Sequence, residues 1–282
     1  PGNTADHRRY ISAFCEAGDY DLIVGVVVTV LPVFLEFAEQ YPNQHFLLIC
    51  MYSYEENWPS NITSIEFREF DASFGPGMVA GWLTKTNKLG FMGGMDIPGI
   101  NDFYYGFREG ARYVNPNVEF VVRYAGEFGN PPLGKEIGLE MYDLGCDVIY
   151  PAAAATSLGV FEAAKEKNKY AIGIDVDQCY IAPNNMPASQ QLGWAVAVKK
   201  ALKRLMEGTL ERDKLYVVSL DDVLGGVGCC PMGESGCKSE MIVPENIREL
   251  VLEAELKILR GEITVPTASG KDVWEDQYGE PL

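Results

Sequence analysis

Histidine and basic residues are scarce in this sequence, and the common catalytic motifs are missing. The 282 residues include two histidines, His7 and His45, and 23 Lys and Arg stand against 40 Asp and Glu, a formal net charge of −17. The sequence contains no HExxH, no GxSxG and no GxxxxGKS/T phosphate loop. We find no catalytic set and expect that the protein is not an enzyme. The negative charge repels phosphate backbones, so we also expect no nucleic-acid partner.

Long apolar runs are missing as well. The most apolar stretch, residues 22–35, is too short to cross a bilayer and is broken by Pro32. We therefore expect contact with a membrane only through a lipid attached upstream of this chain. The apolar fraction of 47% is typical of a globular protein, and the length suits two lobes of modest size.

Cysteine is present in an odd number, seven. Four stand in apolar or element-end contexts and are interpreted as small buried hydrophobes: Cys15, Cys50, Cys146 and Cys179. Three gather in a Gly-rich segment, where they form a disulfide or stay free thiols: Cys229, Cys230 and Cys237. No second cysteine pair or nearby histidine completes a zinc site, so we predict neither a metal nor a cofactor.

Strand and helix patterns alternate along the chain, which predicts parallel sheets with helices on both faces. The predicted strands are residues 21–28, 45–51, 62–67, 89–92, 118–124, 147–150, 170–174 and 215–220. The predicted helices are residues 6–17, 32–41, 73–84, 101–113, 133–144, 158–167, 194–206 and 245–259. Residues 182–187 are rich in Pro and Asn, which is typical of a linker.

Two predicted strands end in residues suited to binding a ligand. Gly93 and Gly94 follow the strand at 89–92, where they allow a sharp turn and a close approach to the backbone. Asp96, just beyond, either accepts a hydrogen bond from a ligand or caps the next helix. Asp175 and Asp177 follow the strand at 170–174, where a carboxylate can accept hydroxyl hydrogen bonds or make a local turn. Because side chains alternate, only one of the two faces a ligand.

Two further segments combine small residues with an aromatic ring or a tight turn. Phe128 lies in a Gly-flanked loop after the strand at 118–124, where its ring can stack on a planar base or plug a neighbouring helix. Residues 152–157 form a run of small residues after the strand at 147–150. This run either admits a ligand to backbone amides or allows tight packing between helix and sheet.

The run from Lys88 to Pro116, with its paired glycines and following helix, resembles the basic membrane protein family of substrate-binding lipoproteins, which includes purine nucleoside receptors of ABC importers. The similarity continues in order over nearly the whole chain. It is carried by six further segments: Asp71-Ala-Ser-Phe, Leu83-Thr-Lys-Thr-Asn-Lys, Gly145-Cys-Asp-Val-Ile, Leu158-Gly-Val-Phe-Glu-Ala-Ala-Lys, Ala171-Ile-Gly-Ile-Asp-Val-Asp-Gln and Arg260-Gly-Glu-Ile-Thr-Val-Pro-Thr.

The resemblance implies an α/β, bilobal type I periplasmic-binding-protein fold, with two doubly wound parallel sheets joined by a hinge. We expect the first part of the N-terminal lobe in residues 1–86 and the C-terminal lobe in 87–181. Residues 182–282 return across the hinge, mostly to the N-terminal lobe, and add the final helix and tail. Members of the family open with a strand, a turn and a helix before anything like residues 5–18, so we expect the first strand–helix–strand unit to be missing.

The residues and the resemblance together give nine candidate ligand-binding residues. Phe128 is expected to form one wall of a base slot, and Asp175 to bind the ribose hydroxyls. The others are Gly94, Asp96, Asn101, Phe103, Ala154, Cys50 and Trp194. The sequence departs from the family at three places: Cys50 replaces an Asp that reads the purine edge, Leu192 replaces a Lys, and Val27-Val28 replaces Gly-Phe.

The resemblance implies an extracytoplasmic, lipid-anchored or periplasmic monomer that captures a nucleoside or nucleoside-like small molecule for an ABC permease. Two alternatives remain. The first is a flytrap-type sensor that regulates a partner, and the second is a nucleoside-processing enzyme on a similar fold. Genes for a permease and an ATPase beside this one would favour transport, whereas a regulator gene would favour sensing.

Overall fold

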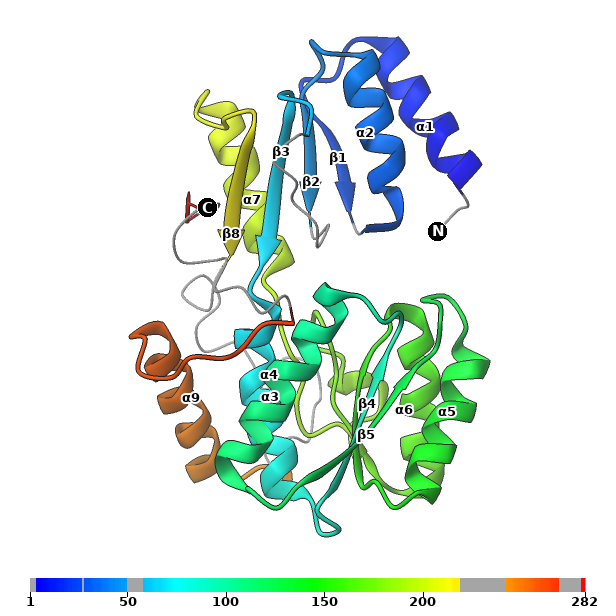
Figure 1. The fold of residues 1–282 in the computed structure, drawn as a ribbon, viewed down its shortest axis with the longest axis vertical. Helices are drawn as coiled ribbons and strands as arrows, with labels where there is room; N and C mark the ends of the chain where they lie inside the picture. Colours follow the sequence, from blue (N-terminus) through cyan, green and yellow to red (C-terminus); the bar gives the residue numbers. More distant parts are fainter. Residues whose placement is uncertain (1–3, 27, 50–57, 219–241, 269–279, 282) are drawn as a thin grey trace. The chain divides into compact units, whose positions relative to one another are not determined.

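The computed structural model describes residues 4–26, 28–49, 58–218, 242–268, 280 and 281. Contacts between residues divide the chain into two compact units. The first unit comprises Pro1–Phe67, Trp194–Val218 and Val273–Leu282, and the second comprises Arg68–Gly193 and Ser219–Asp272. Each unit holds one parallel sheet, in agreement with the predicted pair of α/β lobes (Figure 1).

The first unit is built on a parallel sheet of five strands in the order β1-β2-β3-β8-β9. The strands are β1 (Ile23–Val26), β2 (Phe46–Ile49), β3 (Ile62–Phe67), β8 (Lys214–Val218) and β9 (Glu280–Pro281). Its helices are α1 (Thr4–Ala17), η1 (Val28–Val30), α2 (Leu31–Gln40) and α7 (Trp194–Met206).

Side-chain alternation assigns each helix of the first unit to a face of its sheet. Ile23 and Phe46 belong to the apolar cluster that α1 and α2 cover. Phe67 of β3 points to the other face, where its ring lies 4.7 Å from the ring of Trp194 on α7. On that face, at the β1 end of the sheet, Val24 and Val26 are 46% and 42% exposed. The predicted absence of a first strand–helix–strand unit stays a prediction.

The second unit has a four-stranded parallel sheet in the order β5-β4-β6-β7. The strands are β4 (Lys88–Gly93), β5 (Glu119–Tyr124), β6 (Val148–Ala152) and β7 (Tyr170–Ala171). Its helices are α3 (Glu69–Leu83), α4 (Pro98–Val114), α5 (Pro131–Asp143), η2 (Ala154–Thr156), α6 (Ser157–Lys167), η3 (Cys179–Ile181) and α9 (Glu245–Leu259).

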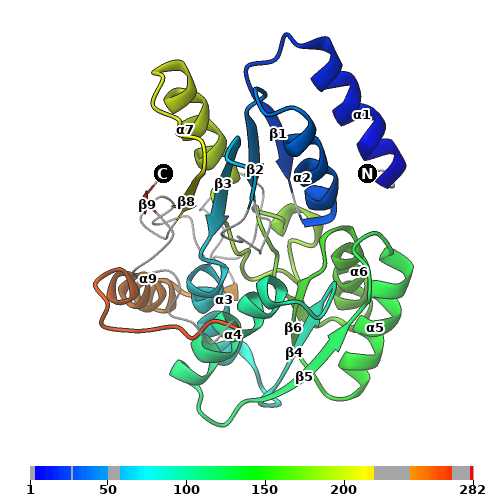
Figure 2. The same ribbon diagram turned by 45° about the horizontal axis from the view of Figure 1, so that its top comes forward.

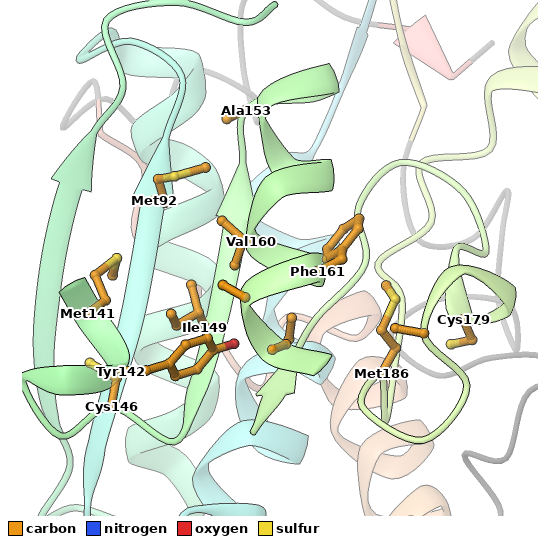
Figure 3. Packing of buried hydrophobic residues seen from close by; sticks show 14 residues of the cluster. Met92, Met141, Tyr142, Cys146, Ile149, Ala153, Val160, Phe161, Cys179 and Met186 are labelled. Carbon is orange, nitrogen blue, oxygen red and sulfur yellow. The ribbon is translucent and has the colours of Figure 1, made fainter. Parts of the chain in front are cut away.

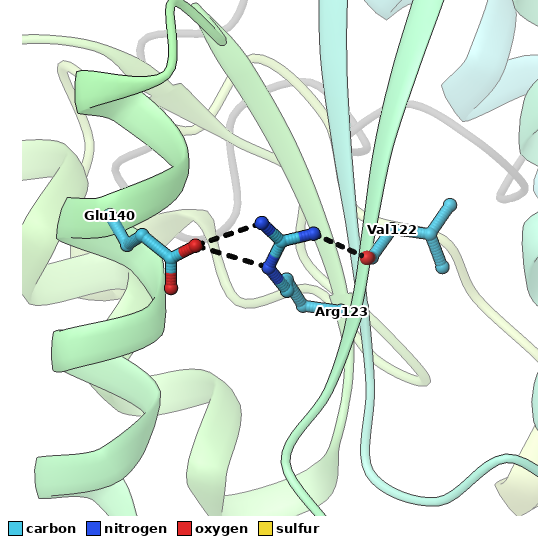
Figure 4. Close-up of polar contacts among 3 residues, drawn as sticks. All are labelled: Val122, Arg123 and Glu140. Carbon is cyan, nitrogen blue, oxygen red and sulfur yellow. Dashed lines mark hydrogen bonds and ion pairs between the residues drawn. The ribbon is translucent and has the colours of Figure 1, made fainter.

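A core of fully buried side chains joins one face of this sheet to α5 and α6 (Figure 3). Met92 and Ile149 come from the strands, Met141 from α5, and Val160 and Phe161 from α6. Burying a side chain of this size contributes roughly 1.5–3 kcal/mol. At the edge of the sheet, a half-exposed ion pair between Arg123 on β5 and Glu140 on α5 adds little to stability (Figure 4).

Helices α3 and α4 pack backbone to backbone, side by side in both views (Figures 1 and 2). A Cβ atom on Gly106 would lie 1.9 Å from the carbonyl oxygen of Phe70, and one on Gly110 would lie 1.9 Å from that of Phe74. Gly77 of α3 faces α4 just as closely, with its Cβ position 2.2 Å from the Phe107 oxygen. Glycine is therefore required at these positions because any side chain would separate the helices.

This packing explains where the division into units differs from the predicted ranges. We expected the N-terminal lobe to continue to residue 86. In the structure the chain leaves the first unit after Phe67, and α3 belongs to the second unit. The returning residues also differ, since only α7, β8 and the C-terminal segment rejoin the first unit and α9 stays with the second. Helix α9 stays there because it packs against α3.

The cysteines follow the prediction in part. Cys15 and Cys146 are buried free thiols, and burial raises the pKa of both. Cys179 is buried too, but it is disulfide-bonded, which corrects its interpretation as a simple buried hydrophobe. The remaining four lie outside the described residues: Cys50, Cys229, Cys230 and Cys237.

Within the described ranges, no helix combines the length and the apolar character needed to cross a membrane.

Glu255 on α9 is 1% exposed, and its Oε1 has no hydrogen-bond partner among the described residues. Burial raises the pKa of Glu255 to about 8. Burial also raises the pKa of Asp102 on α4 to about 6, although the Ala268 amide donates to it.

We expect Gly110→Ala to lower the free energy of unfolding by roughly 1–3 kcal/mol, because the new methyl group overlaps the Phe74 carbonyl. Urea unfolding measures this change. Gly129→Ala is the matched control, since nothing lies within 4 Å of its Cβ position. Equal stability of the two variants would show that α3 and α4 are not in backbone contact.

We expect Glu255→Gln to stabilise the protein increasingly as the pH rises from about 4.5 to about 8. Because the pKa of Glu255 is raised in the folded state, the free energy of unfolding of the unmodified protein falls as the pH increases through that range. Glutamine does not ionise, so the variant avoids this loss. Urea unfolding at several pH values measures the difference from the unmodified protein. Glu253→Gln, on the exposed side of the same helix, should show no such trend. A pH-independent effect of Glu255→Gln would contradict the burial of this carboxyl.

Candidate functional site

Three neighbouring strands of the second unit end level with one another. In the register of the sheet, Gly93 of β4 pairs with Tyr124 of β5 and with Ala152 of β6. The amide of Gly94 donates to the carbonyl of Ala152 at 2.9 Å, which continues this alignment past the strand end. The carboxyl edge of an open α/β sheet is where such folds bind ligands. Most of the predicted site residues lie along this edge.

Gly94 and Phe128 are in direct contact at this edge. A Cβ atom on Gly94 would lie 2.2 Å from a carbon of the Phe128 ring, so the ring rests on the bare backbone of the glycine turn. Phe128 itself is half-buried. The glycine is thus needed for a close approach, and in this structure the group that approaches it is the aromatic ring.

The loop that carries Phe128 is held from the neighbouring turn. The Asn130 amide donates to Thr156 Oγ1 at 2.9 Å, and the Thr156 amide donates to the Phe128 carbonyl at 3.3 Å. Asn130 Oδ1 then accepts from the Leu133 amide and caps α5. Ala154, in the same turn as Thr156, has a left-handed φ of 47°. The small-residue run therefore supports the Phe128 loop.

Asp96 and Asn101 form a polar network with Tyr124 instead of capping a helix. Asn101 Nδ2 donates to Asp96 Oδ1 at 2.8 Å, and the Tyr124 hydroxyl donates to Asn101 Oδ1 at 2.5 Å. Helix α4 begins after Ile97 with no side-chain cap. Burial and the charge of Asp96 raise the pKa of Tyr124 to about 12. These three side chains stiffen the turn beside Phe128.

Asp175 and Asp177 differ in their local contacts, and the prediction that only one of them faces a ligand stays a prediction. Asp177 Oδ1 accepts a hydrogen bond from the Cys179 amide at 3.0 Å, which is a local turn. Asp175 has a left-handed φ of 69°, a conformation that Asp and Asn adopt more readily than other residues with a side chain. Two glutamines hold the strand end: Gln178 Oε1 accepts from the Ile174 amide, and Gln190 Oε1 accepts from the Asp175 amide, both at 2.9 Å.

For the remaining predicted residues, a role in ligand binding stays a prediction. Phe103 is 1% exposed and packs its ring against Tyr150 in the core. Trp194 opens α7 in the first unit. Cys50 and Val27 lie outside the described residues. Leu192 is buried, and its amide donates to the Asp175 carbonyl.

Gln178 and Gln190 are the residues that sequence reasoning missed. Their role is to fix the backbone around Asp175, and one signal for it was present. The run Ser189-Gln190-Gln191 is polar and lies between two apolar residues just before a predicted helix. Ser189 and Gln190 are both fully buried, whereas the residues of an exposed linker would be accessible to solvent.

A separate depression of about 500 Å³ lies in the first unit, at the amino ends of β1 and β2. Its lining includes Cys15, Tyr20, His45 and Arg212. Burial, with help from the Arg212 charge, lowers the pKa of His45 to about 4, so this ring is neutral. The depression contains none of the predicted site residues and lies at the edge of the sheet opposite to the usual ligand edge.

Metal binding finds no support within the described part of the chain. No group of three or more His, Cys, Asp or Glu side chains in those ranges is placed to hold an ion. The polar groups of the candidate site are hydroxyl, amide and carboxylate groups suited to hydrogen bonding with a neutral ligand.

Comparison with known proteins gives one family. Residues 4–269 match the family model Bmp, described as "ABC transporter substrate-binding protein PnrA-like". Basic membrane protein D of Borreliella burgdorferi strain JD1 is 34% identical over 214 residues, which cover 74% of this chain and 63% of that protein. The chain spans 63 to 66% of the length of three curated relatives, all named basic membrane proteins.

Two further similarities extend over more of the chain. The ABC transporter nucleoside-binding protein BmpA of Lactococcus lactis subsp. cremoris is 28% identical over 269 residues, 89% of this chain and 73% of that protein. A crystal structure of an ABC transporter solute-binding protein from Aeropyrum pernix K1 superimposes with a TM-score of 0.78 at 28% identity, covering 95% of this chain and 82% of that one.

We expect Thr156→Val to loosen the Phe128 loop while leaving the sheet intact. Valine has the same shape but leaves the Asn130 amide without its acceptor. Amide hydrogen exchange at Phe128, Gly129 and Asn130 should accelerate roughly tenfold, and exchange in β4 should not change. Thr209→Val, at an exposed position of the first unit, is the control. Unchanged exchange in the loop would show that Thr156 does not hold it.

Proposed function

The chain belongs to the Bmp family of PnrA-like ABC transporter substrate-binding proteins, and we propose that it captures a nucleoside or nucleoside-like compound for import. The observation that carries the proposal is the arrangement at the carboxyl edge of the second unit. An aromatic ring lies on a glycine turn at one strand end, and a carboxylate follows another strand end in the same sheet.

The distance between these groups suits a molecule made of a base and a sugar. The Phe128 ring rests on the turn after β4. Asp175 follows the end of the chain segment that pairs with the other side of β6. Neighbouring strands are about 4.8 Å apart, so two strand spacings separate the groups by roughly 10 Å. A single hexose would reach one of them, whereas a nucleoside would reach both.

The two groups also supply the chemistry that each end of a nucleoside requires. A half-buried Phe ring gives a flat apolar surface for stacking a planar base. A carboxylate accepts hydrogen bonds from neighbouring hydroxyls, and hydrogen bonds to a charged group contribute roughly 1.5–3 kcal/mol. The relative named as a nucleoside-binding protein supports the same ligand class.

Binding would act on the two units as a shift between conformations. The chain passes from one unit to the other after Phe67, Gly193, Val218 and Asp272, and such crossings form a hinge. A ligand that binds the closed form more tightly than the open form increases its population, and an ABC permease would recognise that form. No chemical step is required, and we propose that the protein is a monomeric receptor and not an enzyme.

We further propose an extracytoplasmic location with a lipid anchor upstream of this chain, since receptors for importers meet their ligands outside the cytoplasm. The sensor alternative shares the same binding site and differs in its partner. Co-purification with a permease would support transport, and co-purification with a regulator instead would support sensing.

We expect Asp175→Asn to weaken nucleoside binding by about 10- to 100-fold, because the charged acceptor is lost. Isothermal titration with adenosine, guanosine and inosine measures the affinity. Asp177→Asn is the matched control: it keeps the oxygen that accepts from the Cys179 amide and should bind as the unmodified protein does. Phe128→Ala should weaken all three purine nucleosides similarly, because stacking does not read the base edge.

The proposal is contradicted by a protein that binds none of these nucleosides while simple sugars or other heterocycles raise its melting temperature. A ligand selective for the folded state stabilises it by mass action, so a thermal-shift screen covers all of these compounds in one experiment. Equal loss of affinity in Asp175→Asn and Asp177→Asn would remove Asp175 from the site.

A further inference from the structure

Gln190, which holds the backbone of Asp175, also carries a buried donor that no described residue accepts. The side chain is fully buried, and its Nε2 has no hydrogen-bond partner among the described residues. A buried amide donor without an acceptor costs roughly 1–3 kcal/mol. Buried polar groups in native structures are normally paired, so this donor offers a hydrogen bond that a ligand could accept.

The orientation of this amide group follows from the backbone. The Asp175 amide is a donor and needs an acceptor, so the Gln190 atom at 2.9 Å from it is the oxygen Oε1. The nitrogen Nε2 is therefore the other arm of the same amide group, two bonds away. This geometry places an unused N–H donor beside the residue proposed to bind ligand hydroxyls.

The neighbouring glutamine points elsewhere. The amides of Gln190 and Leu192 donate to the carbonyls of Gly173 and Asp175, the every-second-residue pattern of parallel pairing. In such a segment, alternate side chains point to opposite sides. Gln191 therefore faces away from Gln190, although its Nε2 is also buried and unpaired. This makes Gln191 a matched control of the same chemistry in the adjacent position.

We propose that Gln190 is a specificity residue whose Nε2 donates a hydrogen bond to a ligand hydroxyl oxygen that in turn donates to Asp175. This inference rests on the proposed function, because it assigns a role within the same site. A hydroxyl group can donate one hydrogen bond and accept two, so it satisfies the carboxylate and the amide together. A ligand that lacks this hydroxyl would leave the Gln190 donor without an acceptor, and the site would bind that ligand more weakly.

The test uses titration calorimetry with adenosine, 2′-deoxyadenosine and 3′-deoxyadenosine. Gln190→Met removes the donor with little change in size. Gln190→Glu also removes it but keeps an acceptor for the Asp175 amide, so the strand end stays in place. We expect both variants to bind adenosine about tenfold more weakly and to bind one of the two deoxynucleosides with unchanged affinity. Gln191→Met should leave all three affinities unchanged.

The selectivity between adenosine and the deoxynucleosides separates this role from a structural one. If Gln190 only supported the fold, the variants would lose affinity for all three ligands by the same factor, and the inference would be overturned. Unchanged adenosine affinity in Gln190→Glu would overturn it as well. Failure of the unmodified protein to bind any nucleoside would instead overturn the proposed function, a different result from uniform loss in the variants.

Discussion

The backbone contact between α3 and α4 is the constraint on which the second unit depends. Gly106 and Gly110 allow the α4 backbone to touch the carbonyls of Phe70 and Phe74, and Gly77 does the same from α3. Helix α4 begins directly after the turn that bears Gly94 and Asp96, so its position fixes where that turn lies. The contact also explains why α3 belongs with this sheet and not with the strand that precedes it.

The candidate site is a set of loop groups that neighbouring side chains hold in place. Phe128 is positioned by Thr156 and Asn130, and Asp175 by Gln178 and Gln190. Each of these supports satisfies a backbone amide, so the site is arranged before a ligand arrives. Preorganisation of this kind lowers the conformational cost of binding. The nucleoside that we propose as ligand would meet an aromatic surface and a hydrogen-bonding carboxylate already in place.

Most of the fold could be predicted because hydrophobic periodicity and turn residues act locally. The strand at 62–67 and the helices at 194–206 and 245–259 agree with the structure to the residue, and the other elements differ at their ends. The predicted strand at 170–174 pairs regularly over only two residues, because Gly173 bridges to Ser189 instead. That partner is distant in sequence, so no local pattern could reveal it. The site was predicted as a set of positions, but Phe103 proved to be a core residue because the helical repeat turns it inward.

The sequence by itself determined the class of fold, the paired glycines after β4 and the candidate residues at strand ends, because these depend on composition and short-range spacing. Only the tertiary structure decided that Phe128 covers Gly94, that Asp177 serves its own turn, and that Gln190 supports Asp175. The physical reason is that a hydrogen bond or a ring contact needs two groups within a few ångströms. Chain topology, and not sequence distance, sets which groups meet.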